Sequence, residues 1–340
     1  MSGPRGAPGT PSARFPPVLV NTTSQAQADS PGQVRWYDHG YHTPFFLRLV
    51  FSTIPRLPRF IHPPIAAVTA MIFFVVLRRE RAALMRNLMR LGPHGRLWLR
   101  YKAFKIFYSY CDFMVSYCYV PRADDSSLLS MLADPERGAG TIDGCLAEGN
   151  GLIVWTAHIG NYEYGSRLLE LHGRRVYEAR VVETDNPAEI TLRDLMANER
   201  LEIVALNDDP LASVRLLYAL RANDIVAMQG DRTYNSSCAW VPFLGEPASF
   251  PLGPFFLAYF SGAPVLPCVV VRKGWLRYRV AMGDPIRLPH TGDRDADLRH
   301  GLVRAVAFLE KCCHQHHEQW FNFFDIWPAE GAGGKGTRGT

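Results

Sequence analysis

Short apolar runs alternate with helical patterns along the second half of the chain, and this alternation restricts the fold more than any other feature. After residue 147 the runs are of strand length and rich in β-branched residues, while the segments between them repeat apolar residues at helical spacing. The order of elements predicts an α/β fold built on one sheet. The strand-like runs lie at 152–156, 176–182, 203–206, 225–228 and 265–271, with a candidate sixth at 278–282. The helical patterns lie at 162–171, 188–198, 211–222 and 251–261, and a closing helix extends to about residue 324.

The first strand-like run leads into side chains suited to proton transfer. His158 follows the run directly, and Glu163 lies at the start of the next helical pattern, with Asn161 available as its N-cap. Functional groups in α/β sheets gather outside the carboxyl ends of strands, so we expect a site here. A carboxylate on one ring nitrogen of a histidine fixes the tautomer, and the other nitrogen can then take a proton from a hydroxyl. Spacing alone leaves a second interpretation open, a core histidine satisfied by a nearby carboxylate.

A second polar tip, Gly230-Asp231-Arg232, follows the run at 225–228. The glycine permits close approach of another backbone, and the two charged side chains can hold a polar acceptor or a phosphate. The alternative is an ordinary surface turn. Gly253 and Pro254 open a helical pattern with a proline near its first position, and the free N–H groups of such a start suit an anion.

The lack of several common motifs counts against some enzyme classes, serine hydrolases among them. The sequence contains no Gly-x-Ser-x-Gly elbow of serine hydrolases, no Walker loop and no dinucleotide-binding glycine fingerprint. The run from Cys312 to His317 matches no ordinary zinc spacing, so we expect no metal site and no bound cofactor. Seven scattered cysteines without a CxxC pair suit a reducing compartment rather than a disulfide framework.

An apolar segment near the amino terminus indicates contact with a membrane. Residues 65–77 are thirteen uncharged residues in a row, fewer than the roughly 20 that span a hydrocarbon core as a helix. Arg78 and Arg79 follow directly, and the positive-inside rule then makes the next domain cytoplasmic. We therefore expect an anchor that is either embedded in the membrane or marginally spanning. The alternative is a free-standing core helix.

Basic and aromatic residues crowd the segment 78–120, whose apolar spacing predicts a long helix broken at 92–95. The neighbouring apolar segment favours an anionic membrane over nucleic acid as the partner of these basic residues. The aromatic residues suit either an interfacial belt or core packing. We divide the chain into a disordered tail (1–40), a membrane-associated helical segment (41–120), a catalytic domain (121–328) and a second disordered tail (329–340).

Six stretches, taken together and in this order, resemble a known family. They are His158…Glu163, Gly230-Asp231-Arg232, residues 241–248, Gly253-Pro254, residues 262–267 and residues 318–321. Over about residues 45–327 the chain resembles the bacterial lipid A biosynthesis acyltransferases, which transfer lauroyl or myristoyl groups and are distantly similar to glycerophospholipid acyltransferases. The resemblance implies a mixed sheet flanked by helices, with an N-terminal hydrophobic membrane-anchoring helical segment at the bacterial inner membrane and a cytoplasmic catalytic domain.

The resemblance also implies an activity and a set of site residues. The family moves a fatty acyl group from acyl carrier protein, or in some members from coenzyme A, to a hydroxyl of a glycolipid. His158 matches its general base, Glu163 the orienting carboxylate and Asp231 an acid near the active site. A family arginine that helps to bind the acceptor is placed at Arg193, with Arg200 as the alternative. Further substrate contacts are expected at Asn161, Gly230, Arg232 and Gly253.

Two departures from the family pattern bear on the acceptor. Arg232 stands where the family usually has Gln, and Glu246 stands where a neutral or basic residue is common. A lipid A-type acceptor remains our first expectation, although related enzymes acylate mannosylated phosphoinositides or other membrane lipids.

The mechanism expected from these residues needs no enzyme nucleophile. His158 removes the proton of the acceptor hydroxyl, which attacks the thioester, and backbone N–H groups or an arginine stabilise the oxyanion. An apolar cluster at 255–260 suits either an acyl groove or the core of a helix. Two other function classes stay open: an acyl-thioester hydrolase with water as nucleophile, and a non-catalytic lipid-binding protein.

Overall fold

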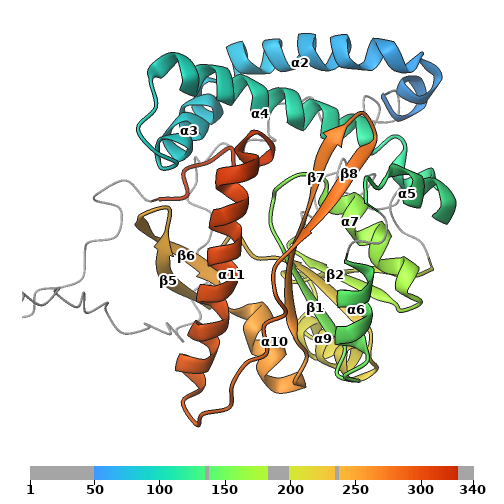
Figure 1. Cartoon of the computed structure of the whole chain (residues 1–340), viewed down its shortest axis with the longest axis vertical. Coiled ribbons are helices and arrows are strands. Elements are labelled where there is room, and N and C mark those ends of the chain that lie inside the picture. Colours follow the sequence, from blue (N-terminus) through green and yellow to red (C-terminus); the bar gives the residue numbers. More distant parts are fainter. Residues whose placement is uncertain (1–49, 135–137, 183–198, 234–236, 328–340) are drawn as a thin grey trace, which may run out of the picture.

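A six-stranded mixed sheet forms the centre of the molecule, as the computed structural model shows for residues 50–134, 138–182, 199–233 and 237–327. The strands are β1 (Leu152–Thr156), β2 (Val176–Arg180), β3 (Leu201–Ala205), β4 (Ile225–Gln229), β7 (Val265–Gly274) and β8 (Arg277–Met282). Their order across the sheet is β3-β2-β4-β1-β7-β8, and all pairings are parallel except that of β7 with β8 (Figure 1). The predicted α/β fold with a mixed sheet flanked by helices is therefore confirmed.

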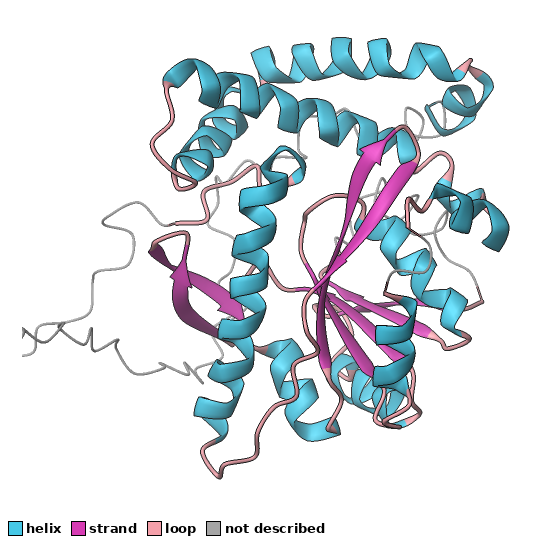
Figure 2. Cartoon of the chain, viewed as in Figure 1, coloured by secondary structure: helices cyan, strands magenta, loops and turns pink. Residues whose placement is uncertain are grey.

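Helices cover both faces of the sheet because both faces of its central strands are apolar (Figure 2). On β1, Ile153 and Trp155 belong to the core that includes residues of three helices, α9 (Ala212–Arg221), α10 (Gly253–Ser261) and α11 (Arg294–His316). Leu152 and Val154 point to the opposite face and share a second core with α6 (Ala139–Leu146) and α7 (Tyr162–Leu169). The alternation along one strand thus separates the molecule into two packed layers around the sheet.

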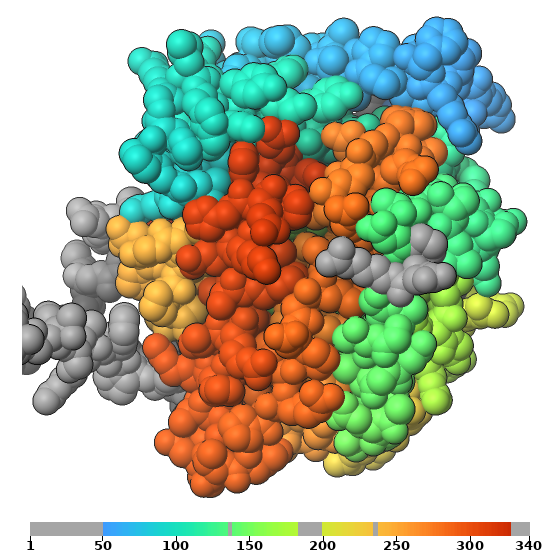
Figure 3. Space-filling view, in the orientation of Figure 1, coloured from blue at the N-terminus to red at the C-terminus, as the bar shows by residue number. Residues whose placement is uncertain are grey.

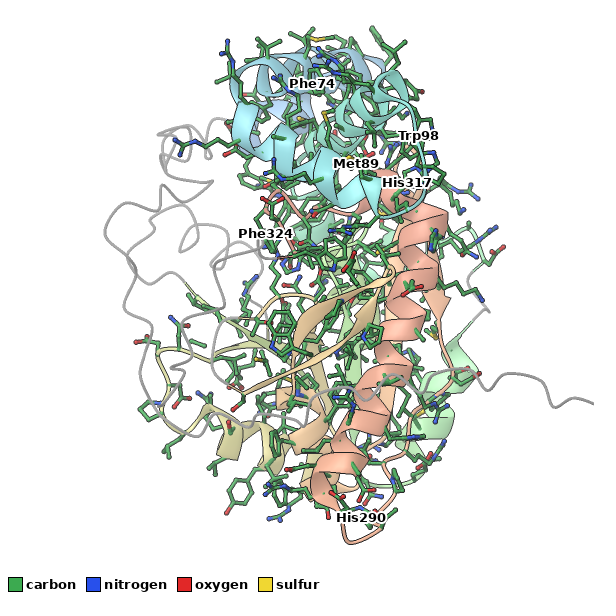
Figure 4. All side chains as sticks on the ribbon, turned by 90° about the vertical axis from the view of Figure 1, so that its left-hand side faces the viewer. Phe74, Met89, Trp98, His290, His317 and Phe324 are labelled. Carbon is green, nitrogen blue, oxygen red and sulfur yellow. The ribbon has the colours of Figure 1, made fainter. Side chains whose placement is uncertain are left out.

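Three amino-terminal helices form a further layer at the end of the molecule where β7 and β8 meet. These are α2 (His62–Val76), α3 (Arg78–Met89) and α4 (Arg96–Ser116), and α2 lies along α4 (Figures 1 and 3). The predicted helix break at 92–95 is confirmed, since α3 ends before it and α4 begins directly after it. Phe321 and Phe323 from the chain end belong to the core of this layer. Figure 4 shows Trp98 of α4 beside His317, and their ring centroids are 5.5 Å apart.

Some elements were not predicted, and their composition explains why. The hairpin of β5 (Cys238–Phe243) and β6 (Glu246–Pro251) contains three prolines, which a two-stranded ribbon tolerates because its strands are edges. α5 (Asp125–Met131) is short, and α6 contains two glycines, which lower helix propensity. The helix expected at 188–198 and the two tails lie outside the described residues. The short 3₁₀ helices are η1 (Ile54–Arg56), η2 (Arg59–Ile61), η3 (Val120–Arg122), η4 (Glu170–His172) and η5 (His317–Gln319).

Candidate active site

The loop between β1 and α7 has a backbone conformation that requires glycine at position 160. Gly160 has a φ of 69°, and a Cβ at this position would lie 2.0 Å from the carbonyl oxygen of Val270. The backbone N–H of Asn161 donates to that same oxygen at 2.7 Å, which fixes the loop against β7. The side chain of Asn161 accepts from the backbone N–H of Tyr164 at 3.0 Å, so its predicted role as N-cap of α7 is confirmed.

His158 is held by Asp231 through two hydrogen bonds. The ring nitrogen Nδ1 lies 2.7 Å from Oδ1, and the backbone N–H of His158 donates to Oδ2 at 3.0 Å. Asn322 also donates to Oδ2, at 3.3 Å. An ionised carboxylate only accepts hydrogen bonds, so this arrangement assigns the proton to Nδ1 and leaves Nε2 free to accept one.

The electrostatic surroundings keep this pair in the form that a base requires. Burial lowers the pKa of His158, the charge of Arg232 lowers it further, and Asp231 opposes both effects. Burial would raise the pKa of Asp231, but the interactions with His158 and Arg232 outweigh it and the pKa is lowered. At neutral pH the site therefore contains a neutral imidazole beside an ionised carboxylate.

Glu163 contacts other groups, and the structure corrects the partner predicted for His158. Its Oε1 accepts from the hydroxyl of Tyr117 at 2.6 Å and lies 3.4 Å from Nη1 of Arg180. The carboxylate that orients the His158 ring is that of Asp231. The reason is the position of Glu163 in the first turn of α7, from which it contacts α4 and β2.

A second buried carboxyl group lies next to Glu163. Glu178 on β2 has Oε1 3.5 Å from Nη1 of Arg180. Burial and the charge of Glu163 raise the pKa of Glu178 to about 7, against the opposing effects of Arg180 and Ser166. Two acids thus lie beside one guanidinium below the loop that carries His158.

The tip after β4 is part of the site rather than a surface turn. A Cβ on Gly230 would lie 1.9 Å from Nε1 of Trp155, so the backbone passes directly over that indole. Arg232 donates from Nε to Oδ1 of Asn322 at 3.2 Å and from Nη2 to the carbonyl oxygen of Phe321 at 2.9 Å. Its guanidinium also lies 5.1 Å from the ring centroid of Phe324. The segment 321–324, which follows η5, therefore contacts both charged residues of the tip, Asp231 and Arg232.

The remaining predicted site residues are not all near His158. Arg193 lies outside the described residues. Arg200 precedes β3 at the amino edge of the sheet, 4.0 Å from Asp125, so this alternative lies at the opposite edge from His158. Gly253 begins α10, whose buried residues pack in the core opposite α7. Glu246 forms a surface ion pair with Arg90 at 2.7 Å.

A cavity of about 600 Å³ lies on the α7 face of the sheet, and Tyr162 is the lining residue that contacts His158. Its polar lining residues include Thr156, Tyr162, Ser166, Asp143 and His172. The ring of Tyr162 meets that of His158 edge-on, with the ring centroids 5.7 Å apart. The apolar walls come from β1, β4, β7, β8, α6 and α7, at Val154, Ala227, Val270, Val280, Ile142 and Leu169. The cluster at 255–260 does not line this cavity: Phe255 and Leu257 are core residues of α10 and Phe260 is exposed.

Asn322 was missed by the sequence analysis because nothing marks a lone asparagine near the chain end as functional. The only signal was its position directly after the family stretch at 318–321. Among the described residues no group of three potential metal ligands occurs. The arrangement of these residues can accept a proton from a hydroxyl beside an apolar cavity.

Comparison with known proteins gives a consistent result. A family model described as bacterial lipid A biosynthesis acyltransferase matches residues 36–328. Two curated proteins, each named phosphatidylinositol mannoside acyltransferase and found in two strains of Mycobacterium tuberculosis, are 31% identical to the chain over 162 residues. The matched part is 46% of this chain and 50% of each relative, so the chain spans about half the length of the curated relatives it matches.

Proposed function

The chain belongs to the bacterial lipid A biosynthesis acyltransferase family, and from this premise we propose that it is a membrane-associated O-acyltransferase that moves a fatty acyl group from a thioester to a hydroxyl of a glycolipid. The observation that carries the proposal is the buried pair of His158 and Asp231 at the carboxyl ends of neighbouring strands.

The proposed reaction proceeds without a covalent enzyme intermediate. Nε2 of His158 takes the proton of the acceptor hydroxyl, and the hydroxyl oxygen forms a bond to the thioester carbonyl carbon. The C–S bond then breaks, and the leaving thiolate takes the proton from the imidazolium. Asp231 stabilises the imidazolium while it exists, and Arg232 supplies positive charge for the oxyanion or for a phosphate of the acceptor.

The cavity lined by Tyr162, whose ring contacts His158, suits the acyl chain of the donor. Its volume of about 600 Å³ is in the range of small-molecule sites, and its walls are mostly apolar. Each buried methylene contributes about 0.8 kcal/mol, so an acyl chain binds there by burial alone. On this proposal the thioester lies toward Thr156 and Tyr162, which line the cavity.

The acceptor is proposed to be a glycolipid with a phosphate group. Arg232 provides a cation that the family usually lacks at this position, and the names of the two mycobacterial relatives refer to a phosphatidylinositol mannoside. Lipid A precursors and phosphatidylinositol mannosides both contain a sugar hydroxyl and a phosphate. The donor is a thioester of acyl carrier protein or of coenzyme A.

Membrane association is proposed to occur through α2. By length and composition, the helix at Arg59–Val76 is the one among the described residues that is able to cross a membrane. Ala66 and Ala70 are buried against α4, whereas the opposite side exposes Val68, Ile72 and Val76. A helix with one packed face and one apolar exposed face suits a position in one leaflet, with Arg78 and Arg79 at the cytoplasmic surface of the inner membrane.

The experiment offers the purified protein lauroyl and palmitoyl thioesters of coenzyme A and of acyl carrier protein. The acceptors are a lipid A precursor and a phosphatidylinositol mannoside in detergent micelles, and mass spectrometry detects the ester. We expect acceptor-dependent ester formation that His158→Ala abolishes. Free fatty acid formed at the same rate without acceptor would identify a hydrolase, and lipid binding without turnover would identify a non-catalytic protein.

A further inference from the structure

The last turns of α4 contact three successive residues of the His158…Glu163 loop. Tyr117, directly after α4, donates its hydroxyl proton to Glu163 at 2.6 Å. Ser116 accepts from the side-chain amide of Asn161 at 2.8 Å. The ring of Phe113 lies 5.1 Å from that of Tyr162, between those two contacts. The first turn of α7 is therefore held by the helical layer as well as by the sheet.

Tyr162 connects these contacts between α4 and α7 to His158. Its ring meets the His158 ring edge-on, and Asp231 holds the same imidazole at Nδ1. Two contacts thus hold the imidazole ring: the hydrogen bond to Asp231, which sets its tautomer, and the edge-on ring of Tyr162. Because Tyr162 and Glu163 are adjacent in the same helical turn, a shift of Glu163 moves the aromatic ring as well.

The hydroxyl of Tyr117 is suited to a permanent donor role. Burial raises the pKa of Tyr117 well above its ordinary value, and the charge of Glu163 raises it further, so the phenol keeps its proton throughout the working pH range. Oε2 of Glu163 is buried and has no hydrogen-bond partner among the described residues. Oε1 contacts Tyr117 at 2.6 Å and Arg180 at 3.4 Å, so the bond from Tyr117 is the shorter of these two contacts.

We propose that Tyr117 is a positioning residue of the acyl transfer: by holding Glu163 it sets the first turn of α7, which presents Tyr162 to His158. Glu163 on this account acts as the anchor of that turn and not as the acid that orients the base. The inference rests on the proposed function. It also makes the geometry of the base depend on α4, the helix against which the membrane-facing α2 packs.

The first test compares two tyrosines that each donate a buried hydrogen bond. Tyr117→Phe removes the bond to Glu163, and the control Tyr164→Phe removes a bond from α7 to the carbonyl oxygen of Leu128. Transfer from palmitoyl-coenzyme A to phosphatidylinositol mannoside is measured with the full chain, together with the melting temperature. We expect Tyr117→Phe to lower kcat about tenfold with little change in KM, and Tyr164→Phe to lower only the melting temperature.

A pH profile distinguishes positioning from loss of stability. A displaced Tyr162 admits water to His158, and this reduces the burial that lowers its pKa. The base is active when neutral, so the rising limb of kcat/KM in Tyr117→Phe should move to higher pH. The limb of Tyr164→Phe should remain in place.

Two substitutions at Glu163 complete the test. Glu163→Gln keeps an oxygen that accepts from Tyr117, so kcat should fall only about threefold. In a Glu163→Ala background, Tyr117→Phe should have no further effect, because the two side chains act as one unit. Independent losses that multiply would overturn the inference.

The inference and the proposed function fail in different ways. Wild-type kcat and pH profile in Tyr117→Phe, in a protein whose transfer activity is lost in His158→Ala, would overturn the inference alone. Absence of acyl transfer by the wild-type protein would overturn the proposed function. If Tyr117→Phe fails to fold, Glu163→Gln still tests the inference. A fall in its kcat of about a hundredfold or more would assign Glu163 a direct part in the chemistry and overturn the inference.

Discussion

At the scale of single residues, the chemistry depends on how His158 obtains its carboxylate. Its position after a strand was predicted from the sequence, because an apolar run ending in a polar residue marks a sheet edge. Its partner was not predicted correctly, since Glu163 is near in sequence whereas Asp231 is 73 residues away. Spacing in the sequence shows only which residues are close along the chain. Asp231 reaches His158 because β4 and β1 are neighbours in the sheet.

Replacement of Arg232 tests the electrostatics of the base. Burial lowers the pKa of His158 and the charge of Arg232 lowers it further. In Arg232→Gln the imidazolium forms more readily, so the pKa rises and the rising limb of kcat/KM moves to higher pH. The matched control is Arg272→Gln, whose guanidinium pairs with Asp112 at 3.0 Å. A limb that stays in place in Arg232→Gln, or moves equally in both variants, would contradict this account of the site.

At the scale of elements, the pairing of β1 with β4 creates the site. Thr156 is the register partner of Gln229, and the residues two positions further along each strand direction are His158 and Asp231. The six strands were predicted from their apolar runs with small errors at their ends. The order β3-β2-β4-β1-β7-β8 was not, because it depends on which faces pack together and no local pattern encodes that choice.

The cavity across the α7 face predicts which side chains determine acyl length. Ala227 on β4 lines the cavity beside Val154, one step deeper in the sheet than Thr156. Ala227→Leu adds three carbon atoms in a closely packed space, so the preferred donor should shorten by about three carbons. Competition between lauroyl and palmitoyl thioesters measures the preference. The control Ala179→Leu adds the same volume in the core on the other face, and an equal change in both variants would exclude the cavity as the acyl site.

At the scale of the whole molecule, a helical layer lies over the end of the sheet that bears the catalytic loop. The layer was predicted as a membrane-associated segment, and its helices and their break were found from apolar spacing. Its attachment to the sheet through Phe321 and Phe323 was not, because those residues follow α11 at the far end of the chain. The family match spans both the layer and the sheet.

Charge placed on the exposed side of α2 tests the proposed membrane contact. Ile72 is 54% exposed and Val76 is 57% exposed, so acidic side chains there do not disturb the core. The double variant Ile72→Glu/Val76→Glu should reduce co-sedimentation with anionic phospholipid vesicles about tenfold or more, with an unchanged melting temperature. Val303→Glu on α11 is the control, since this residue is 44% exposed on a different surface. Vesicle binding unaffected in the double variant would show that α2 is not the contact.

The most direct measurement of the central claim is the single-turnover rate of acyl transfer in two variants, Asp231→Asn and Glu163→Gln. The claim is that Asp231 orients the base and stabilises its imidazolium, while Glu163 acts from a distance through α4. We predict that Asp231→Asn lowers the rate about a thousandfold, since a neutral amide lacks the charge that stabilises the imidazolium and its NH₂ group can hold the ring in the other tautomer, whereas Glu163→Gln lowers it about threefold. The reverse order, with Asp231→Asn near the wild-type rate and Glu163→Gln inactive, would contradict the account.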